Sequence, residues 1–323
     1  MVLKTIPVFE KPKLDKIDKK ILFYLSQNLR YPRNKLSSEL KISPQKLAYR
    51  INKLMTEIIQ PTLLMNYPLM GIPSYVILLK GLSEEDKREI EKAEEIYLFI
   101  QLIGNYSYYV QVISEDIELF CKKYLNKYSY EIYPIKEYIP DNFNPFEINS
   151  NEKKRIQRVT SKKEQIVLDK YDYKLLLELA KDPLQSNLEI SQNAKIDRIT
   201  VKKRLDKLLH LNVIQKFRYA TDVFKYGFIL YELKIKAPLN SIQKILSIID
   251  SNKYSGFRHR SFNTIFMSYI PPSHIELFSF IETLKKAEYK IEIEVMQNTG
   301  TYIVETIPEV VKKYLSKKAI TPA

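Results

Sequence analysis

The sequence predicts an α+β protein in which two winged helix-turn-helix domains alternate with two ferredoxin-like βαββαβ domains. Three observations predict this fold class. Residues 14–54 recur at residues 168–208 with a constant offset of 154 and 13 identical residues. Each copy opens with three short helical patterns. Each copy then continues with patterns in the order strand, helix, strand, strand, helix, strand. We therefore interpret the chain as a tandem duplication of one unit.

The composition limits the classes of function. The chain has 52 Lys or Arg and 38 Asp or Glu among 323 residues, so its formal net charge is +14. Such a charge favours a polyanionic partner. The single cysteine, Cys121, excludes an internal disulfide and a cysteine-based zinc site. Six glycines leave no phosphate-binding loop of the GxGxxG or GxxxxGK type. We expect no membrane span and no secretory signal, because no sufficiently long apolar run occurs.

Three helices are expected at the start of each copy. In the first copy they cover residues 17–25, 36–42 and 44–55, where apolar side chains recur at helical spacing. Ser43 suits the N-cap of the third helix, and Asp197 takes that position in the second copy. A short hairpin is expected after each third helix, which completes the winged plan. The strands of these hairpins are residues 58–59 with 63–64 and residues 213–214 with 217–219.

The segments that follow predict the two βαββαβ domains. In the first copy the elements are residues 75–79, 83–93, 97–103, 106–113, 114–127 and 130–139. In the second copy they are residues 228–235, 239–249, 255–261, 264–270, 273–287 and 289–295, followed by a strand at 301–306 and a basic helix at 308–318. The resulting domain boundaries are 1–66 (winged helix 1), 67–140 (ferredoxin-like 1), 141–166 (basic linker), 167–222 (winged helix 2) and 223–323 (ferredoxin-like 2 with the C-terminal helix).

Specific residues in both parts of the unit resemble the Lrp/AsnC (leucine-responsive regulatory protein) family of transcription regulators. Residues 14–22 are similar to the family's opening helix, and residues 36–54 are similar to its helix-turn-helix. The turn Gly104-Asn105-Tyr106-Ser107 is similar to the turn before the third strand of its effector domain. The resemblance implies a regulator that reads duplex DNA through the third helix. Because family members usually carry one copy and dimerise, this chain resembles a tandem fusion whose βαββαβ domains pair.

The resemblance also implies a small-molecule effector site at Gly104, Asn105, Tyr106 and Ser107. The family's turn commonly carries an acidic residue where this chain has Ser107, so an amino-acid ligand would lose a partner for its ammonium group. The second copy has Ser261-Phe262-Asn263-Thr264 without glycine and departs further from the family's pattern.

The outward residues of each third helix are the predicted DNA contacts. Lys and Arg neutralise phosphates, whereas Gln, Lys and Arg near the start of a recognition helix can read base edges. A solvated charged face is the alternative for such a helix taken alone. Residues 14–60 contain ten basic and four acidic residues, and residues 168–215 contain nine and seven, so the first copy is expected to bind more strongly. The predicted contacts are Gln45, Lys46, Tyr49, Arg50 and Lys53, and Arg198, Thr200, Lys203, Arg204 and Lys207.

Two other functions were weighed against a regulator. Paired domains of this architecture also resemble siroheme decarboxylases, in which His and Arg hold the carboxylates of a tetrapyrrole. Arg258-His259-Arg260 lies on a predicted strand where such groups could sit, or forms a charged strand face at a domain interface. A chromatin-type protein that coats DNA with little sequence preference is the other alternative.

We expect a DNA-binding regulator that is not an enzyme, with no catalytic residue, metal or cofactor. Its expected partners are double-stranded DNA, a small-molecule effector and further copies of the chain, because sheet faces rich in Ile, Tyr and Leu must be covered. A cytoplasmic location in association with the nucleoid is expected.

Overall fold

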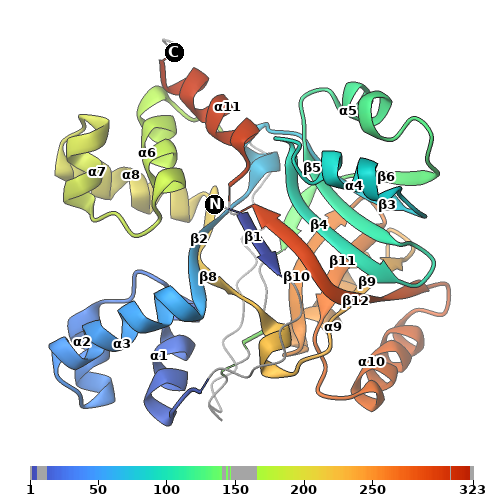
Figure 1. The fold of residues 1–323 in the computed structure, drawn as a ribbon, viewed down its shortest axis with the longest axis horizontal. Coiled ribbons are helices and arrows are strands. Elements are labelled where there is room, and N and C mark those ends of the chain that lie inside the picture. The colour runs from blue at the N-terminus through green and yellow to red at the C-terminus, as the bar shows by residue number, and fades with distance from the viewer. Residues whose placement is uncertain are drawn as a thin grey trace. The chain divides into compact units, whose positions relative to one another are not determined.

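A computed structural model describes residues 2–5, 13–139, 143–144, 146, 166–305 and 307–320. The chain divides into two compact units (Figure 1). The sheet unit contains Met1–Glu10, Gly71–Phe143 and Val223–Pro308. The head unit contains Lys11–Met70, Asn144–Asp222 and Glu309–Ala323. Within the described residues, no helix has both the length and the apolar character needed to cross a lipid bilayer.

The first half of the sheet unit has the predicted βαββαβ order. Its elements are β3 (Ser74–Leu79), α4 (Glu84–Ile90), β4 (Ile96–Ile103), β5 (Tyr108–Ile113), α5 (Ile117–Tyr124) and β6 (Tyr130–Pro134). Within the sheet these strands lie in the order β6-β3-β5-β4. This order places the first and third strands of the motif at the centre, as a ferredoxin-like domain requires.

The second half repeats this arrangement with one difference from the prediction. Its elements are β9 (Tyr231–Lys236), α9 (Ile242–Ser251), β10 (Ser255–Ser261), β11 (Thr264–Tyr269), α10 (His274–Ala287) and β12 (Glu292–Glu305). Its strands lie in the order β12-β9-β11-β10. Two separate strands were predicted at 289–295 and 301–306, which was wrong. They form the single strand β12 because its two ends pair with different neighbours, Glu292–Gln297 with β9 and the later residues with β4.

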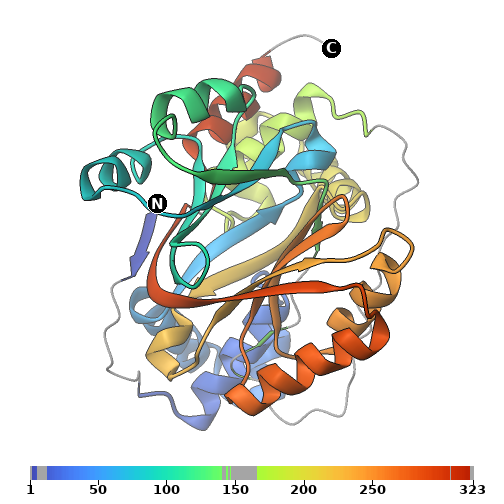
Figure 2. The same cartoon turned by 90° about the vertical axis from the view of Figure 1, so that its right-hand side faces the viewer.

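The two halves join into one sheet whose ends meet. Strand β12 joins the halves by pairing with β4, and β7 (Glu137–Ile139) pairs with β10 at the other end. Only Ile135 and Lys136 separate β7 from β6, and their N–H groups donate to Ser74 and Arg260 carbonyls at 2.8 Å. The chain therefore passes from one end of the sheet to the other and closes it, with the long curved β12 across the junction (Figure 2). Strand β1 (Val2–Thr5) adds to β12 outside this path.

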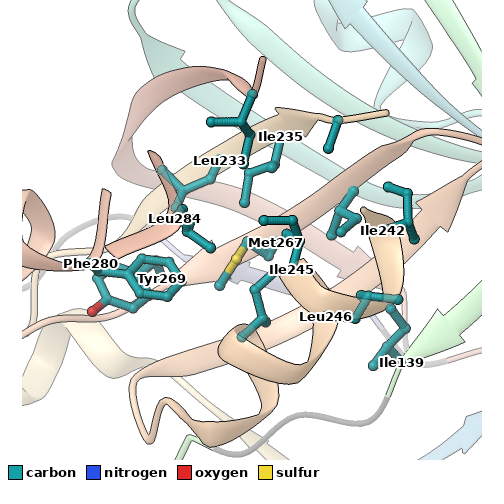
Figure 3. Packing of buried hydrophobic residues seen from close by; sticks show 14 of the residues in the cluster. Ile139, Leu233, Ile235, Ile242, Ile245, Leu246, Met267, Tyr269, Phe280 and Leu284 are labelled. Carbon is teal, nitrogen blue, oxygen red and sulfur yellow. The ribbon is translucent and has the colours of Figure 1, made fainter. Parts of the chain in front are cut away.

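Helices cover the outer face of each half, and the inner faces cover one another. In the second half, β9 and β11 pack against α9 and α10 through residues such as Leu233, Met267, Ile245 and Leu284 (Figure 3). A matching cluster under α4 and α5 contains Ile77, Val110 and Phe120. On the inner side, the Tyr109 ring of β5 lies 6.2 Å from the Phe266 ring of β11. The sequence predicts apolar sheet faces that other copies of the chain would have to cover. Both faces are instead covered within one chain.

The head unit contains two three-helix domains. The first is α1 (Lys16–Gln27), α2 (Arg33–Leu40) and α3 (Pro44–Glu57), and the second is α6 (Lys170–Lys181), α7 (Asn187–Ala194) and α8 (Arg198–His210). Both copies begin with the same capping box, from Asp15 with Asp18 and from Asp169 with Asp172. Each carboxylate satisfies backbone N–H groups that the first turn of a helix leaves without partners.

The predicted hairpin within each copy is wrong. Each copy contributes one strand, β2 (Ile59–Met65) and β8 (Ile214–Thr221), and the two pair antiparallel with each other. Pairing between copies satisfies both backbones as well as a local hairpin would, and the turn residues that favour a two-residue hairpin are absent at 60–62 and 215–216. The wing is thus a two-stranded sheet shared by the copies.

Further contacts join the two three-helix domains within the head unit. The Tyr219 hydroxyl on β8 donates to the Leu22 carbonyl of α1 at 2.8 Å. Arg30 donates to the Gln185 carbonyl at 2.7 Å and lies over the Phe217 ring. The C-terminal helix α11 (Glu309–Ile320) packs against α6, where the Tyr173 and Tyr314 rings meet. The boundary 223–323 had grouped this helix with the second sheet domain. Most of the predicted basic linker 141–166 lies outside the described residues.

Candidate nucleic-acid interface

The first three-helix domain (α1–α3) is called the first head below, and the second (α6–α8) the second head. The recognition helix of the first head is α3, and it begins where the sequence predicts. The Ser43 hydroxyl accepts from the Lys46 N–H at 3.2 Å, and Pro44 occupies the first turn. Leu47, Ile51 and Leu54 are buried beneath the helix, with at most 4% of each exposed. The opposite face is therefore turned to solvent. It presents four of the five predicted DNA contacts: Gln45, Lys46, Tyr49 and Lys53.

Arg50, the fifth predicted contact, lies between two helices. Its Nη1 atom is 2.7 Å from Asp15 Oδ2 and 2.7 Å from Asp18 Oδ1, and 19% of its side chain is exposed. The hydrogen bonds that Arg50 donates to these two carboxylates raise its pKa. The Asp18 backbone N–H and the Arg50 side chain lower the pKa of Asp15. Arg50 thus fastens α3 to the start of α1, and its charge is already matched by two carboxylates.

The second head repeats this triad of residues. The Asp197 carboxylate caps α8 by accepting from the Thr200 N–H at 2.9 Å. Arg204 Nη1 lies 2.7 Å from Asp169 Oδ1 and 2.8 Å from Asp172 Oδ1. Lys207 Nζ lies 2.6 Å from Asp172 Oδ2. Two of the five predicted contacts of this head, Arg204 and Lys207, are therefore held in ion pairs within the domain.

The surface of the second recognition helix differs from the sequence-based expectation. Arg198 and Lys203 are exposed as predicted, whereas Thr200 is half-buried. Lys202 and Ile199 are also exposed, and neither was among the predicted contacts. Ile199 takes the position of Gln45 in the repeat. An aliphatic side chain cannot form the hydrogen bonds that Gln45 can, so α3 and α8 present different chemical groups at this position.

The role of the four aspartates was missed at the sequence level. The favourable interaction of a carboxylate with the helix dipole is by itself enough to explain Asp15 and Asp18 at the start of α1. A signal was nevertheless present, because Asp15, Asp18 and Arg50 recur together as Asp169, Asp172 and Arg204 at the same offset. Identities that include both signs of charge in a diverged repeat are typical of an internal ion pair.

The four residues of the predicted effector turn have different surroundings. Gly104 has φ +150°, and a Cβ there would lie 3.2 Å from Met296 Cγ. Ser107 is used by the backbone, since its hydroxyl donates to the Lys80 carbonyl at 2.9 Å. Asn105 is exposed. Only the Tyr106 side chain is buried, and its hydroxyl donates to Glu131 Oε1 at 2.6 Å.

The Arg258-His259-Arg260 segment lies on β10 as predicted, but its side chains have separate environments. Arg258 has no exposed surface and pairs with Asp250 of α9 at 2.8 Å. His259 points to the inner side, where its Nε2 lies 2.5 Å from the Tyr109 hydroxyl and its ring stacks on Phe266. Burial lowers the pKa of His259 to about 3. Arg260 pairs with Glu137 of β7 at 3.1 Å.

The inner side of the closed sheet also contains a buried carboxyl group. Glu232 on β9 is 4% exposed and accepts from the Ser268 hydroxyl at 2.9 Å. Burial raises its pKa to about 7, against the opposing hydrogen bonds from Ser268 and Asn298. With neutral His259, this group gives the inner side two buried titratable side chains.

The head segments match a known family of DNA-binding domains. Residues 14–57 and 168–215 each match the family model of winged helix-turn-helix DNA-binding domains. No curated protein matches the chain. Both segments are thus winged helix-turn-helix domains.

Solved structures share the fold of the whole chain. The crystal structure of the siroheme decarboxylase NirDL aligns with a TM-score of 0.57 and 13% identity, covering 94% of this chain and 98% of that chain. The same decarboxylase in complex with an iron-uroporphyrin III analogue has a TM-score of 0.54, 14% identity and coverages of 88% and 91%. An AsnC family transcriptional regulator from Agrobacterium tumefaciens is 17% identical with a TM-score of 0.34, covering 39% of this chain and 92% of that chain.

The family model confirms the two predicted winged helix-turn-helix domains, and the likeness to NirDL shows a shared fold over nearly the whole chain. The chain carries two winged helix-turn-helix domains and two ferredoxin-like domains, in the tandem arrangement expected from its internal repeat.

Proposed function

We propose that this chain is a transcription regulator that binds duplex DNA through the recognition helices of its two heads. One observation carries the proposal. In both segments that match DNA-binding domains, the third helix buries its apolar face and turns the opposite face to solvent, where the exposed cationic residues include Lys46, Lys53, Arg198 and Lys203. A helix of this kind is the element that enters the major groove in helix-turn-helix proteins.

The proposed contacts fall into two groups. We propose that Gln45 and Lys46 in the first turn of α3, and Arg198 in the first turn of α8, meet base edges. Tyr49, Lys53 and Lys203 lie further along and are assigned to phosphates. Arg50, Arg204 and Lys207 support these contacts indirectly, because they hold each recognition helix against the first helix of its head.

The salt dependence of binding tests the proposal. We expect the affinity for a fluorescent duplex, measured by anisotropy, to fall steeply as salt rises, with a slope of about −0.9 per phosphate neutralised. The double variant Lys53→Ala, Lys203→Ala should reduce that slope by about 2, because each of these lysines is assigned to one phosphate. The matched control is Lys285→Ala, Lys286→Ala, which removes the same charge from exposed positions on α10. Equal losses in both double variants would contradict the assigned surface.

A sequence-independent DNA-coating protein is separated from a regulator by competition. A regulator selects a subset of sequences from a random duplex library, and that subset resists competition by bulk DNA. A coating protein binds the selected and unselected pools equally. We propose a regulator because Gln45 and Ile199, at equivalent positions, give the heads distinct groups with which to read bases.

The tetrapyrrole enzyme is the second candidate, and the likeness of the whole fold to NirDL favours it. The residues that prompted this alternative do not fit the carboxylates of an incoming tetrapyrrole. Arg258 has no exposed surface and is paired with Asp250, and His259 is buried on the other face of the strand. We therefore infer that the chain is not a decarboxylase. Titration with iron uroporphyrin tests this, since a saturable absorbance change lost in His259→Gln would revive the enzyme.

Other expectations stay predictions. Association into homodimers or larger oligomers is measurable by light scattering of the purified chain. Association with the nucleoid is measurable by crosslinking the tagged protein to DNA in cells.

A further inference from the structure

One ammonium group of the sheet unit is enclosed by aromatic rings and a carboxylate. Lys234 on β9 belongs to the second half, and 10% of its side chain is exposed. Its Nζ atom lies 2.8 Å from Glu131 Oε2 and 3.3 Å from the Tyr106 hydroxyl. It also lies 5.3 Å from the ring centres of both Tyr106 and Tyr133. These three residues all come from the first half.

The electrostatics of this group favour a cation strongly. The face of an aromatic ring attracts an ammonium, and this attraction grows when water is excluded. Burial opposes the charge on Lys234, but hydrogen bonds with Glu131, Tyr133 and Tyr106 outweigh it and raise its pKa. Burial would likewise raise the pKa of Glu131, yet Lys234 and the two tyrosines lower it to about 2. The pair is therefore ionised across the whole range in which the protein is handled.

The lysine is a feature of one half only. Lys234 pairs with Phe266 on β11 and Glu294 on β12. In the first half, the residue with the matching neighbours is Leu78, which pairs with Tyr109 on β5 and Glu131 on β6. The duplicated framework thus provides a glutamate in each half but a single ammonium between them, and Lys234 lies 3.6 Å from Glu294 as well.

We infer that Tyr106, Tyr133 and Glu131 form a binding site for a primary alkylammonium group, and that the chain fills this site with its own Lys234. The site opens to solvent at Glu131, whose side chain is 42% exposed.

The variant Lys234→Ala vacates the site and allows a direct test. It removes three methylenes and the ammonium, which together correspond to propylammonium. We expect added propylammonium chloride to raise the melting temperature of Lys234→Ala by about 2 °C or more above the effect of equal sodium chloride. Neither 1-propanol nor propionate should do so. Wild type and Lys236→Ala are the matched controls, because Lys236 lies on the same strand but is exposed and pairs with Glu292 at 3.4 Å.

An effect of propylammonium that is equal in Lys234→Ala, Lys236→Ala and wild type would overturn the inference. If Lys234→Ala does not fold, the wild type still provides a test. In a chain with nitrogen-15 lysine, the enclosed ammonium should give a protected Nζ signal at neutral pH that disappears in Glu131→Gln. Absence of that signal from wild type would also overturn the inference. Both readouts are independent of DNA, so their failure leaves the proposed function untouched.

Discussion

The guanidinium of Arg50 lies 2.7 Å from the Asp18 carboxylate, and Arg204 repeats this contact with Asp172 at 2.8 Å. The surroundings of the two pairs differ. Asp18 has 17% of its side chain exposed, whereas Asp172 has none and is also contacted by Lys207. An ion pair costs more to break when the remaining charge stays buried. Removal of the arginine is therefore expected to cost more free energy of unfolding in the second head than in the first.

Arg204→Ala should destabilise the protein more than Arg50→Ala. We expect a loss of roughly 2–3 kcal/mol for Arg204→Ala, because the buried Asp172 carboxylate then keeps Lys207 but loses its guanidinium partner. Arg50→Ala should cost about 1 kcal/mol, since Asp15 and Asp18 can be hydrated. Urea unfolding followed by circular dichroism measures both. Lys53→Ala serves as a control on the exposed face, and a loss in that control as large as in Arg204→Ala would contradict the ranking.

Glu232 should make stability fall as the pH rises from about 5 to 8. Its folded pKa of about 7 lies above its ordinary value of 4.5, so the folded protein holds the proton more tightly than the unfolded chain. Stability is therefore greatest below pH 4.5 for this group and is lost as the pH rises through 7. Glu232→Gln removes the titration, and its advantage over wild type should grow across this range by up to about 3 kcal/mol. His259 has the opposite sign but is present in both proteins, so its effect cancels in the difference.

Thermal melts of both proteins at pH 5, 6, 7 and 8 check this expectation. An advantage of Glu232→Gln that stays constant with pH would show that Glu232 does not titrate in this range.

Gly104→Ala should destabilise the sheet unit by about 1–2 kcal/mol. Gly104 has a left-handed φ, and the new methyl group would meet Met296 of the paired strand β12. Gly81→Ala is the control, because no atom lies within 4 Å of a Cβ there. Melting temperatures measured by calorimetry distinguish the two. If both variants melt alike, the close approach between Gly104 and β12 is not a constraint.

Much of the fold could be predicted because it depends on local signals. The N-caps Ser43 and Asp197 and the spacing of Leu47, Ile51 and Leu54 determine where the recognition helices begin and which side they bury. Pairings between distant segments left no such signal. Residues 59–65 read equally well as half of a hairpin, and their pairing with residues 214–221 depends on how the two copies pack. The continuity of β12 likewise depends on having β9 and β4 as successive neighbours.

The sequence predicted which residues lie on the outward face of each recognition helix, but not which of their charged side chains are already held in ion pairs. Periodicity correctly placed Lys46, Tyr49 and Lys203 at the surface. It could not show that Arg50, Arg204 and Lys207 are engaged, since their partners lie 32 or 35 residues away on another helix. The enclosure of Lys234 was beyond reach for the same reason, because Glu131 is 103 residues distant. Interactions of this kind require knowledge of which elements are neighbours in space.

Covalent fusion changes how such a protein can evolve. In an assembly of two identical chains, every substitution appears twice, once on each side of the symmetry axis. Here Leu78 and Lys234 differ although their neighbours correspond, so a change on one side need not be tolerated on the other. Selection can therefore act on each half separately, and under the proposed function the exposed faces of α3 and α8 are free to specialise for unlike half-sites.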